Sequence, residues 1–169
     1  YNADDHPMLR KGITDLIKET DGLESVGSGE NGKVALEEIR SLKPDVAVLD
    51  IEMPYFTGLD IVKTLVAEGI STHFIVLTLY KEEEFLNKSL KLGVKGYLLK
   101  ESNEQDIIAC IHAVAEGRAY VDPSLSSYLI SQKKDKEGAL ENLSDHEVDI
   151  LRLISRQHTS AEIADMLFI

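Results

Sequence analysis

Short apolar runs alternate with longer amphipathic segments along most of the chain. Short runs bounded by polar residues are typical of buried β-strands, and apolar positions repeating every three or four residues are typical of helices. The predicted strands are residues 23–26, 45–50, 73–78 and 95–99. The apolar faces of four predicted helices begin at Leu9, Leu59, Phe85 and Ile107. Helix C-caps are predicted at the glycines at 69, 93 and 117.

This alternation predicts an α/β fold with a doubly wound parallel sheet, which helices cover on both faces. The run at 73–78 is almost wholly apolar, as a central strand covered on both faces should be. A first strand must precede Asp4, but only residues 1–3 are available to form it. We therefore expect that the start of the natural chain is missing, because the first central strand should contain more apolar residues.

The pattern changes after residue 120. Residues 1–120 form one predicted domain, and residues 121–142 include a polar stretch and form a predicted linker. Residues 143–169 begin with a capping box, in which Ser144 caps a helix and Glu147 reaches back to it. A second short helix follows. Two short helices cannot bury a core alone, so this small all-α fragment is either docked or part of something longer.

The composition, with 43% hydrophobic and 28% charged residues, is that of a soluble globular protein. No apolar run approaches the roughly 20 residues of a membrane helix, and the N-terminus lacks the basic and apolar regions of a signal peptide. Cys110 is the one cysteine, so it cannot form an internal disulfide, and we expect it to be a small packing residue. Because the chain has no disulfide, we expect a cytoplasmic protein. The net charge of −12 does not by itself predict DNA binding.

Polar residues stand at the carboxyl ends of four predicted strands. Asp4 and Asp5 follow the first strand, Asp50 ends the third, Thr78 ends the fourth and Lys100 follows the fifth. In an open parallel sheet, ligands bind beyond these strand ends. Each residue alone has an ordinary interpretation: a turn aspartate, a strand threonine or a solvated lysine. Their occurrence together at four strand ends favours a functional site.

Three carboxylates held together repel one another, and a divalent cation relieves that repulsion. Oxygen ligands favour Mg²⁺, which pairs well with phosphate. Asp50 can then act as a carboxylate nucleophile toward a phosphoryl donor. Lys100 can neutralise charge on the phosphoryl oxygens, and Thr78 is placed to hydrogen-bond the new phosphate. His6 follows the acidic pair and could be a metal ligand or a proton donor, but we expect it to help fix the start of the first helix.

Several motifs resemble those of a response-regulator receiver domain, and they cover residues 1 to about 120. They are Asp4-Asp5-His6-Pro7, VLDIEMPYFTGLD at 48–60, VLTLY at 76–80 and KGYLLKES at 95–102. The sequence at 143–169 is similar to the start of the helix-turn-helix domain of the NarL/LuxR family. The resemblance implies a flavodoxin-like, five-stranded sheet with strand order 2-1-3-4-5. It also implies a two-component response regulator rather than an enzyme.

The resemblance further implies roles for individual residues. Asp50 would be the phospho-acceptor. Asp5, Asp50 and the main-chain carbonyl of Glu52 would hold Mg²⁺, and Asp4 would act largely through water. Lys100 would bind the phosphoryl group. The bond after Lys100 would be a cis peptide bond, at a cost of about 3 kcal/mol.

Thr78 and Tyr97 would be a switch pair. The Thr78 hydroxyl would turn toward the phosphate, and the Tyr97 ring would swing inward to fill the vacated space. Without the resemblance, Tyr97 could equally be an ordinary half-buried aromatic residue of a strand.

The resemblance also implies partners. They are a sensor histidine kinase, DNA in the full-length protein, and a second copy of the chain when Asp50 is phosphorylated. By analogy with the family, the second helix of the segment 143–169 is the first of the helix-turn-helix pair. The recognition helix would therefore start just after Ile169, and these 169 residues alone are not expected to bind DNA.

A P-loop NTPase is the main alternative, because Gly27–Lys33 has the glycine and lysine spacing of a phosphate-binding loop. Against it, Val34 stands where a P-loop needs serine or threonine to bind Mg²⁺, and Glu30 places a carboxylate where phosphates would lie. Asn31 is better interpreted as the cap of the second helix, with Lys33 on its exposed side. A third possibility is a receiver-like binding module that never accepts phosphate.

Overall fold

The computed structural model describes residues 1–125, all within the first of the two units into which the chain divides, Tyr1–Tyr128. The described residues form one sheet of six parallel strands in the order β2-β1-β3-β4-β5-β6. The strands are β1 Asn2–Ala3, β2 Ser28–Gly29, β3 Val46–Asp50, β4 His73–Thr78, β5 Gly96–Leu99 and β6 Tyr120–Val121. The helix-turn-helix expected at 143–169, and the predicted linker beyond residue 125, lie outside the described residues.

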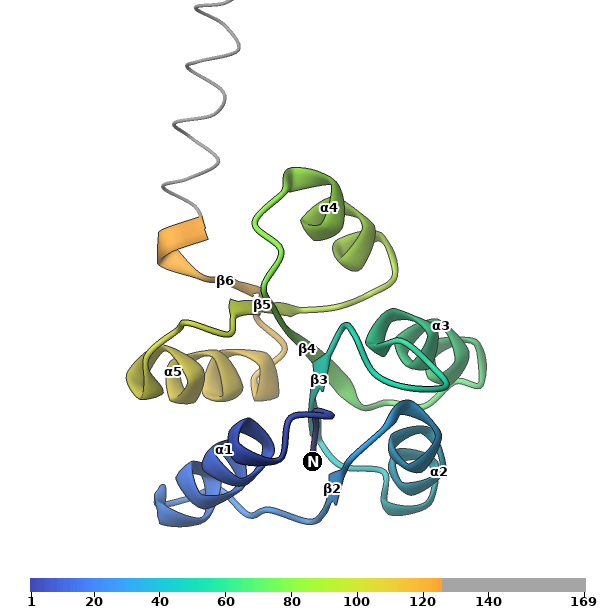
Figure 1. The fold of residues 1–169 in the computed structure, drawn as a ribbon, viewed down its shortest axis with the longest axis horizontal. Coiled ribbons are helices and arrows are strands. Elements are labelled where there is room, and N and C mark those ends of the chain that lie inside the picture. Colours follow the sequence, from blue (N-terminus) through green and yellow to red (C-terminus); the bar gives the residue numbers. More distant parts are fainter. Residues whose placement is uncertain (126–169) are drawn as a thin grey trace, which may run out of the picture. The chain divides into compact units, whose positions relative to one another are not determined.

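Within residues 1–125, five helices connect the strands and cover both faces of the sheet (Figure 1). They are α1 Pro7–Glu19, α2 Gly32–Leu42, α3 Gly58–Ala67, α4 Glu83–Lys91 and α5 Glu104–Ala115. Helices α1 and α5 lie on one face, and α2, α3 and α4 lie on the other (Figure 1). The predicted doubly wound α/β fold is confirmed, and the order of its first five strands is as expected. None of the described helices is long and apolar enough to cross a membrane.

The central strands are buried along almost their whole length. Only the first residue of β3 and the first residue of β4 are partly exposed. Strands buried on both faces read as continuous apolar runs, which is why the sequence located β3, β4 and β5 within one residue of their observed bounds.

The second strand was predicted in the wrong place. Residues 23–26 precede β2, which pairs with β1 through Asn2 opposite Ser28 and Ala3 opposite Gly29. A strand can form backbone hydrogen bonds only along the length of the neighbouring strand, and β1 contains two residues. Pairing is therefore confined to Ser28–Gly29, although the apolar run lies before it.

The sixth strand was not predicted. Tyr120 pairs with Gly96 and Val121 with Tyr97, so β6 extends the sheet beyond β5. The Asp122 N–H continues the contact by donating to the Tyr97 carbonyl at 2.9 Å. Two residues carry no recognisable period, and Val121 falls within the predicted linker at 121–142.

The helix ends agree with the sequence. The Asn31 side chain accepts a hydrogen bond from the Val34 N–H at 3.0 Å and caps α2, as predicted. Gly69, Gly93 and Gly117 follow α3, α4 and α5 with positive φ angles of 74°, 97° and 79°. The described residues contain no cis peptide bond, so the expected cis bond after Lys100 is wrong. Residue 101 is glutamate, and a cis peptide bond is low in energy only before proline.

The core on the α1 and α5 face brings these two helices against the central strands. Its members are Ile13, Ile17, Val48, Ile75, Leu77, Leu98, Ile107, Cys110, Ile111 and Val114. Cys110 is fully buried, as expected for a packing residue, and burial raises the pKa of its thiol to about 12. A Cβ atom on Gly96 would lie 2.8 Å from the Cys110 Sγ and 2.7 Å from the Ile75 Cγ1. The absence of a side chain at Gly96 therefore lets α5 approach β5.

Candidate functional site

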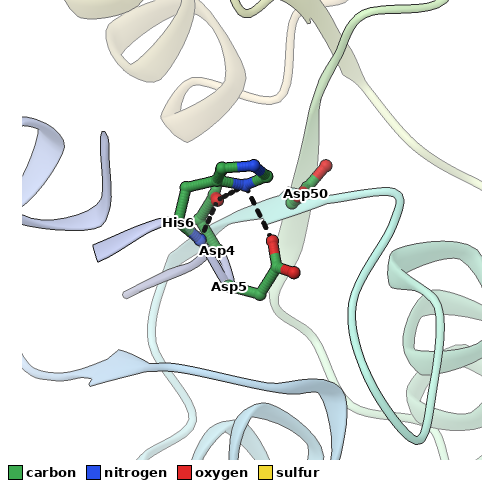
Figure 2. Close-up of side chains that lie close together, drawn as sticks. All are labelled: Asp4, Asp5, His6 and Asp50. Atoms are coloured by element: carbon green, nitrogen blue, oxygen red, sulfur yellow. Dashed lines mark hydrogen bonds and ion pairs between the residues drawn. The ribbon is translucent and has the colours of Figure 1, made fainter. Parts of the chain in front are cut away.

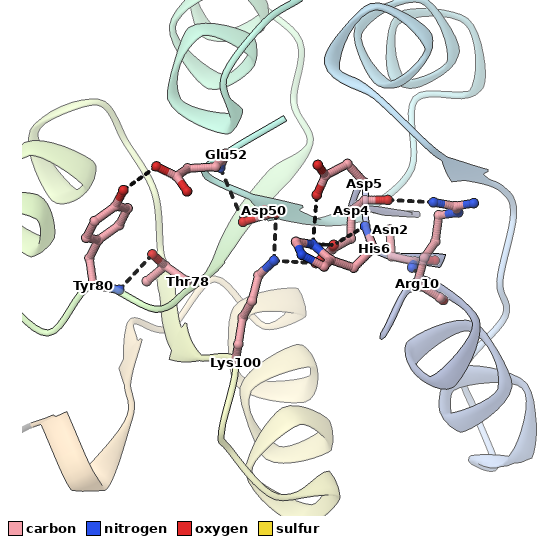
Figure 3. A network of polar contacts seen from close by, with 10 residues as sticks. All are labelled: Asn2, Asp4, Asp5, His6, Arg10, Asp50, Glu52, Thr78, Tyr80 and Lys100. Atoms are coloured by element: carbon pink, nitrogen blue, oxygen red, sulfur yellow. Dashed lines mark hydrogen bonds and ion pairs between the residues drawn. The ribbon is translucent and has the colours of Figure 1, made fainter. Parts of the chain in front are cut away.

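The carboxyl ends of four strands meet at one edge of the sheet, and the predicted polar residues converge there (Figure 3). Asp4 follows β1, Asp50 ends β3, Thr78 ends β4 and Lys100 follows β5. Parallel strands bring these residues together because all their carboxyl ends lie at the same edge. The expected juxtaposition is present, and the chemical roles of the residues depend on the contacts among them.

Lys100 forms ion pairs with two buried carboxylates. Its Nζ lies 2.7 Å from the Asp50 Oδ2 and 3.0 Å from the Asp4 Oδ2. The side chains are 11% exposed for Lys100, 4% for Asp50 and 1% for Asp4, so little water screens these pairs. Burial by itself would lower the pKa of Lys100, but the contacts with Asp50 and Asp4 outweigh it and the pKa is raised. Lys100 therefore remains a cation inside the site.

The environment of Asp50 disfavours its charged form. Burial is the largest cause of its raised pKa, and the negative charge of Asp4 acts in the same direction. The hydrogen bond from Lys100 and the one from the Glu52 N–H, 3.2 Å from the Asp50 Oδ1, lower the pKa but do not cancel the shift. A further cation in the site would stabilise the carboxylate.

Asp4, Asp5, His6 and Asp50 each offer one ligand atom, and these atoms all lie within 4.8 Å of one another (Figure 2). The Asp4 Oδ2 and the Asp5 Oδ1 are buried and accept no hydrogen bond within the described part of the chain. They lie only at ion-pair distance from Lys100 and His6. Buried carboxylate oxygens that lack main-chain or hydroxyl donors and contact only these two nitrogen groups suit a hard divalent cation, so these residues fit Mg²⁺.

His6 occupies the N-cap position of α1, but its side chain makes no capping hydrogen bond. Its N–H donates to the Asp4 Oδ1 at 2.8 Å, and its ring Nδ1 lies 2.8 Å from the Asp5 Oδ1. Pro7 occupies the first turn of the helix, where its fixed φ favours helix initiation. The expectation that His6 helps fix the helix start holds for its backbone, while its ring contacts the acidic pair.

Thr78 and Tyr97 are both buried beside the site. The Thr78 Oγ1 accepts a hydrogen bond from the Tyr80 N–H at 3.1 Å. The Tyr97 side chain is completely buried, and its hydroxyl donates to the Tyr80 carbonyl at 2.9 Å. Burial raises the pKa of Tyr97 to about 12. The Tyr97 ring therefore lies fully inside the fold, and its role in a switch stays a prediction.

Comparison with protein families matches residues 2–112 to the response regulator receiver domain. The chain belongs to this family. Among relatives, it is 34% identical to the nitrate/nitrite response regulator protein NarL of Escherichia coli, over 97% of this chain and 78% of that protein. It is 31% identical to the oxygen regulatory protein NreC of Staphylococcus carnosus, over 99% of this chain and 81% of that protein.

A solved structure gives the same result. The DNA-binding response regulator of the LuxR family from Staphylococcus aureus matches with a TM-score of 0.65 and 31% identity, over 68% of this chain and 95% of that chain. The molecule is thus a two-component response regulator of the NarL/LuxR type. The motifs quoted from the sequence, from Asp4 to Ser102, all lie within the matched residues 2–112.

Tyr80 is a residue of this receiver domain whose importance the sequence did not reveal. Its hydroxyl donates to the Glu52 carboxylate (Figure 3), and its ring stacks on Phe85 with 4.2 Å between ring centroids. Its N–H and carbonyl are the partners of Thr78 and Tyr97. Tyr80 therefore connects the end of β4 to the loop after Asp50 and to α4. Its place two residues after Thr78, within the quoted motif, was the available signal.

The stretch Gly27–Lys33 of this receiver domain does not have the arrangement of a P-loop. Its Gly32 N–H, which would face phosphate in a P-loop, donates to the Pro54 carbonyl at 3.0 Å. A Cβ atom on Gly32 would lie 2.0 Å from the Phe56 carbonyl oxygen, so the loop is packed against residues 54–56. Lys33 is exposed, as predicted. These contacts account for the glycine at position 32 without nucleotide binding.

Proposed function

We propose that the chain is a phosphorylation-dependent switch in which Asp50 accepts a phosphoryl group from a sensor histidine kinase. The observation that supports this most strongly is the ion-pair contact of the Lys100 ammonium with both Asp50 and Asp4 at the carboxyl edge of the sheet. A cation held at that position is suited to a group that arrives with negative charge. Membership of the receiver family supports the same assignment.

In the proposed transfer, a carboxylate oxygen of Asp50 attacks the phosphorus of the kinase phosphohistidine. The new O–P bond forms an acyl phosphate, the P–N bond breaks, and the imidazole leaves with its electron pair and takes up a proton. Lys100 moves its contact from the Asp50 oxygen to a phosphoryl oxygen, and Thr78 donates its hydroxyl to another. The chain is therefore a phospho-acceptor rather than an enzyme with turnover.

The residues that would hold Mg²⁺ are Asp5, Asp50 and the carbonyl of Glu52, with Asp4 acting largely through water. When bound, the ion supplies positive charge that neutralises the phosphoryl oxygens during transfer. The close grouping of the Asp4, Asp5 and Asp50 oxygens supports this ligand set. The Thr78 Oγ1 already accepts a hydrogen bond from the Tyr80 N–H, and the switch pair Thr78 and Tyr97 would respond once the same hydroxyl turns to donate its proton to a phosphoryl oxygen.

We further infer that the output is transcriptional. The proposed organisation is a receiver domain at 1–120, a linker at 121–142 and the start of a helix-turn-helix domain at 143–169, in a protein whose full-length form binds DNA as a phosphorylated homodimer. The names of the relatives support this inference. An electrophoretic assay should detect sequence-specific binding for the full-length protein but not for these 169 residues alone.

Intact-mass analysis tests the phospho-acceptor directly. The chain is incubated with a small phosphodonor and Mg²⁺, and the expected product carries the mass of one added phosphoryl group. Asp50→Asn should abolish the addition, because the amide is not a nucleophile, and EDTA should suppress it. Addition that persists in Asp50→Asn, or that does not depend on Mg²⁺, would contradict the assignment.

A further inference from the structure

Helix α1 and strand β1 are joined by reciprocal hydrogen bonds next to the acidic pair. Asn2 is 1% exposed, and its Nδ2 donates to the Arg10 carbonyl at 3.1 Å. The Thr14 Oγ1 lies 3.0 Å from the Asn2 Oδ1 and 2.8 Å from the Arg10 carbonyl, and it can donate its one proton to either. In the opposite direction, the Arg10 Nη1 donates to the Asp4 carbonyl at 2.7 Å (Figure 3). A strand side chain thus holds the helix backbone, and a helix side chain holds the strand backbone.

The carbonyl that Arg10 binds belongs to the peptide unit joining Asp4 to Asp5. Strand β1 ends at Ala3, so this carbonyl lies past the last paired residue, and its partner is a side chain rather than a neighbouring strand. The Asp4 N–H is fixed separately by the Gly29 carbonyl at 3.2 Å. Because a peptide unit is planar, holding its oxygen fixes the direction in which the next residue leaves. Arg10 therefore sets the orientation of Asp5 relative to Asp4.

The charge of Arg10 alone would act against a divalent cation. A guanidinium beside the acidic cluster repels Mg²⁺, and this repulsion by itself lowers the affinity of the site. The contact at 2.7 Å is a charge-assisted hydrogen bond, which holds geometry more firmly than a neutral one. If Arg10 acts by orienting the carboxylates, replacing it should weaken Mg²⁺ binding. If it acts only through its charge, replacing it should strengthen Mg²⁺ binding.

We propose that Arg10 is a positioning residue for the acidic pocket, acting through the Asp4–Asp5 peptide, and that Asn2 and Thr14 hold the Arg10 backbone in the required place. This proposal rests on the proposed function, because it assumes that Asp4 and Asp5 serve a Mg²⁺ site. Arg10 touches neither the cation nor the phosphoryl group; it orients the carboxylates that do.

Calorimetric titration of the unphosphorylated chain with Mg²⁺ tests the proposal without any transfer reaction. Arg10→Gln should weaken Mg²⁺ binding about tenfold, the lower end of the loss typical for groups that orient metal ligands. Arg10→Lys keeps one charged donor and should recover part of the affinity. Arg40→Gln is the matched control, because Arg40 pairs with the exposed Glu68 on α3's C-cap, and should leave the affinity unchanged.

The outcomes separate the possible roles. Tighter Mg²⁺ binding by Arg10→Gln would mean that Arg10 acts only as a nearby charge, and unchanged binding with a lower melting temperature would mean a purely structural role; either result overturns the proposal. If Arg10→Gln does not fold, Thr14→Val replaces it and should also weaken Mg²⁺ binding, and an unchanged affinity there would overturn the proposal. Failure of the wild type to bind Mg²⁺ would instead refute the proposed function.

Discussion

Replacing Lys100 with methionine should destabilise the folded chain at neutral pH. The substitution keeps most of the side-chain volume but removes the cation that lies 2.7 Å from Asp50 and 3.0 Å from Asp4. Breaking a buried ion pair by removing one partner costs roughly 3–5 kcal/mol, because the remaining charge is left uncompensated. The Lys100 side chain is 11% exposed, so we expect the lower end, about 3 kcal/mol of unfolding free energy at pH 7.

The loss should depend on pH in a defined direction. The pKa of Asp50 is already raised by burial, and removing Lys100 takes away its largest lowering influence. A carboxyl whose pKa is higher in the folded state than in the unfolded state favours folding as the pH falls. Protonating Asp50 also removes the uncompensated charge. The penalty of Lys100→Met should therefore shrink between pH 7 and pH 5.

Urea denaturation in the absence of Mg²⁺ measures this penalty at both pH values. Lys81→Met is the matched control, because Lys81 pairs with Glu101 at the surface, with 41% and 60% of the side chains exposed. Exposed pairs contribute about 0–1 kcal/mol, so the control should change little. A loss below about 1 kcal/mol for Lys100→Met, or one that does not vary with pH, would refute the reasoning.

Three further substitutions test other features. Gly96→Ala should cost about 1–3 kcal/mol of unfolding free energy in urea, because the new Cβ would overlap Ile75 and Cys110. Thr57→Ala should cost about 1 kcal/mol in the same assay by removing the capping box of α3. Although burial opposes it, hydrogen bonds from Ser102 and Ser124 lower the pKa of Asp122, so the stability lost in Asp122→Asn should be full at neutral pH and vanish as pH falls below about 4.

Features set by local pattern were predictable from the sequence. The bounds of β3 and β4 follow from continuous apolar runs, and the positive φ angles after α3, α4 and α5 follow from glycines at the helix ends. The convergence of Asp4, Asp50 and Lys100 was also predictable, because the topology of a parallel sheet places every strand end at one edge.

Features that depend on pairing between distant segments were not predictable. The apolar run at 23–26 has the composition of a strand, but β1 offers a partner only to Ser28–Gly29. The role of Tyr80 depends on contacts with Glu52 and Phe85 that only the folded loops bring together. The hydrogen bond between Arg10 and the Asp4 carbonyl likewise joins a side chain to a main-chain group, and no sequence pattern indicates such a pairing.

The deep burial of Cys110 has a practical consequence. A thiol with no exposed surface and a pKa of about 12 is almost entirely in its unreactive protonated form while the fold is closed. Thiol-directed reagents can modify it only when the core around it opens, so the labelling rate reports on that opening. Cys110 is therefore a native probe of this opening, and mass spectrometry can follow its modification without an introduced label.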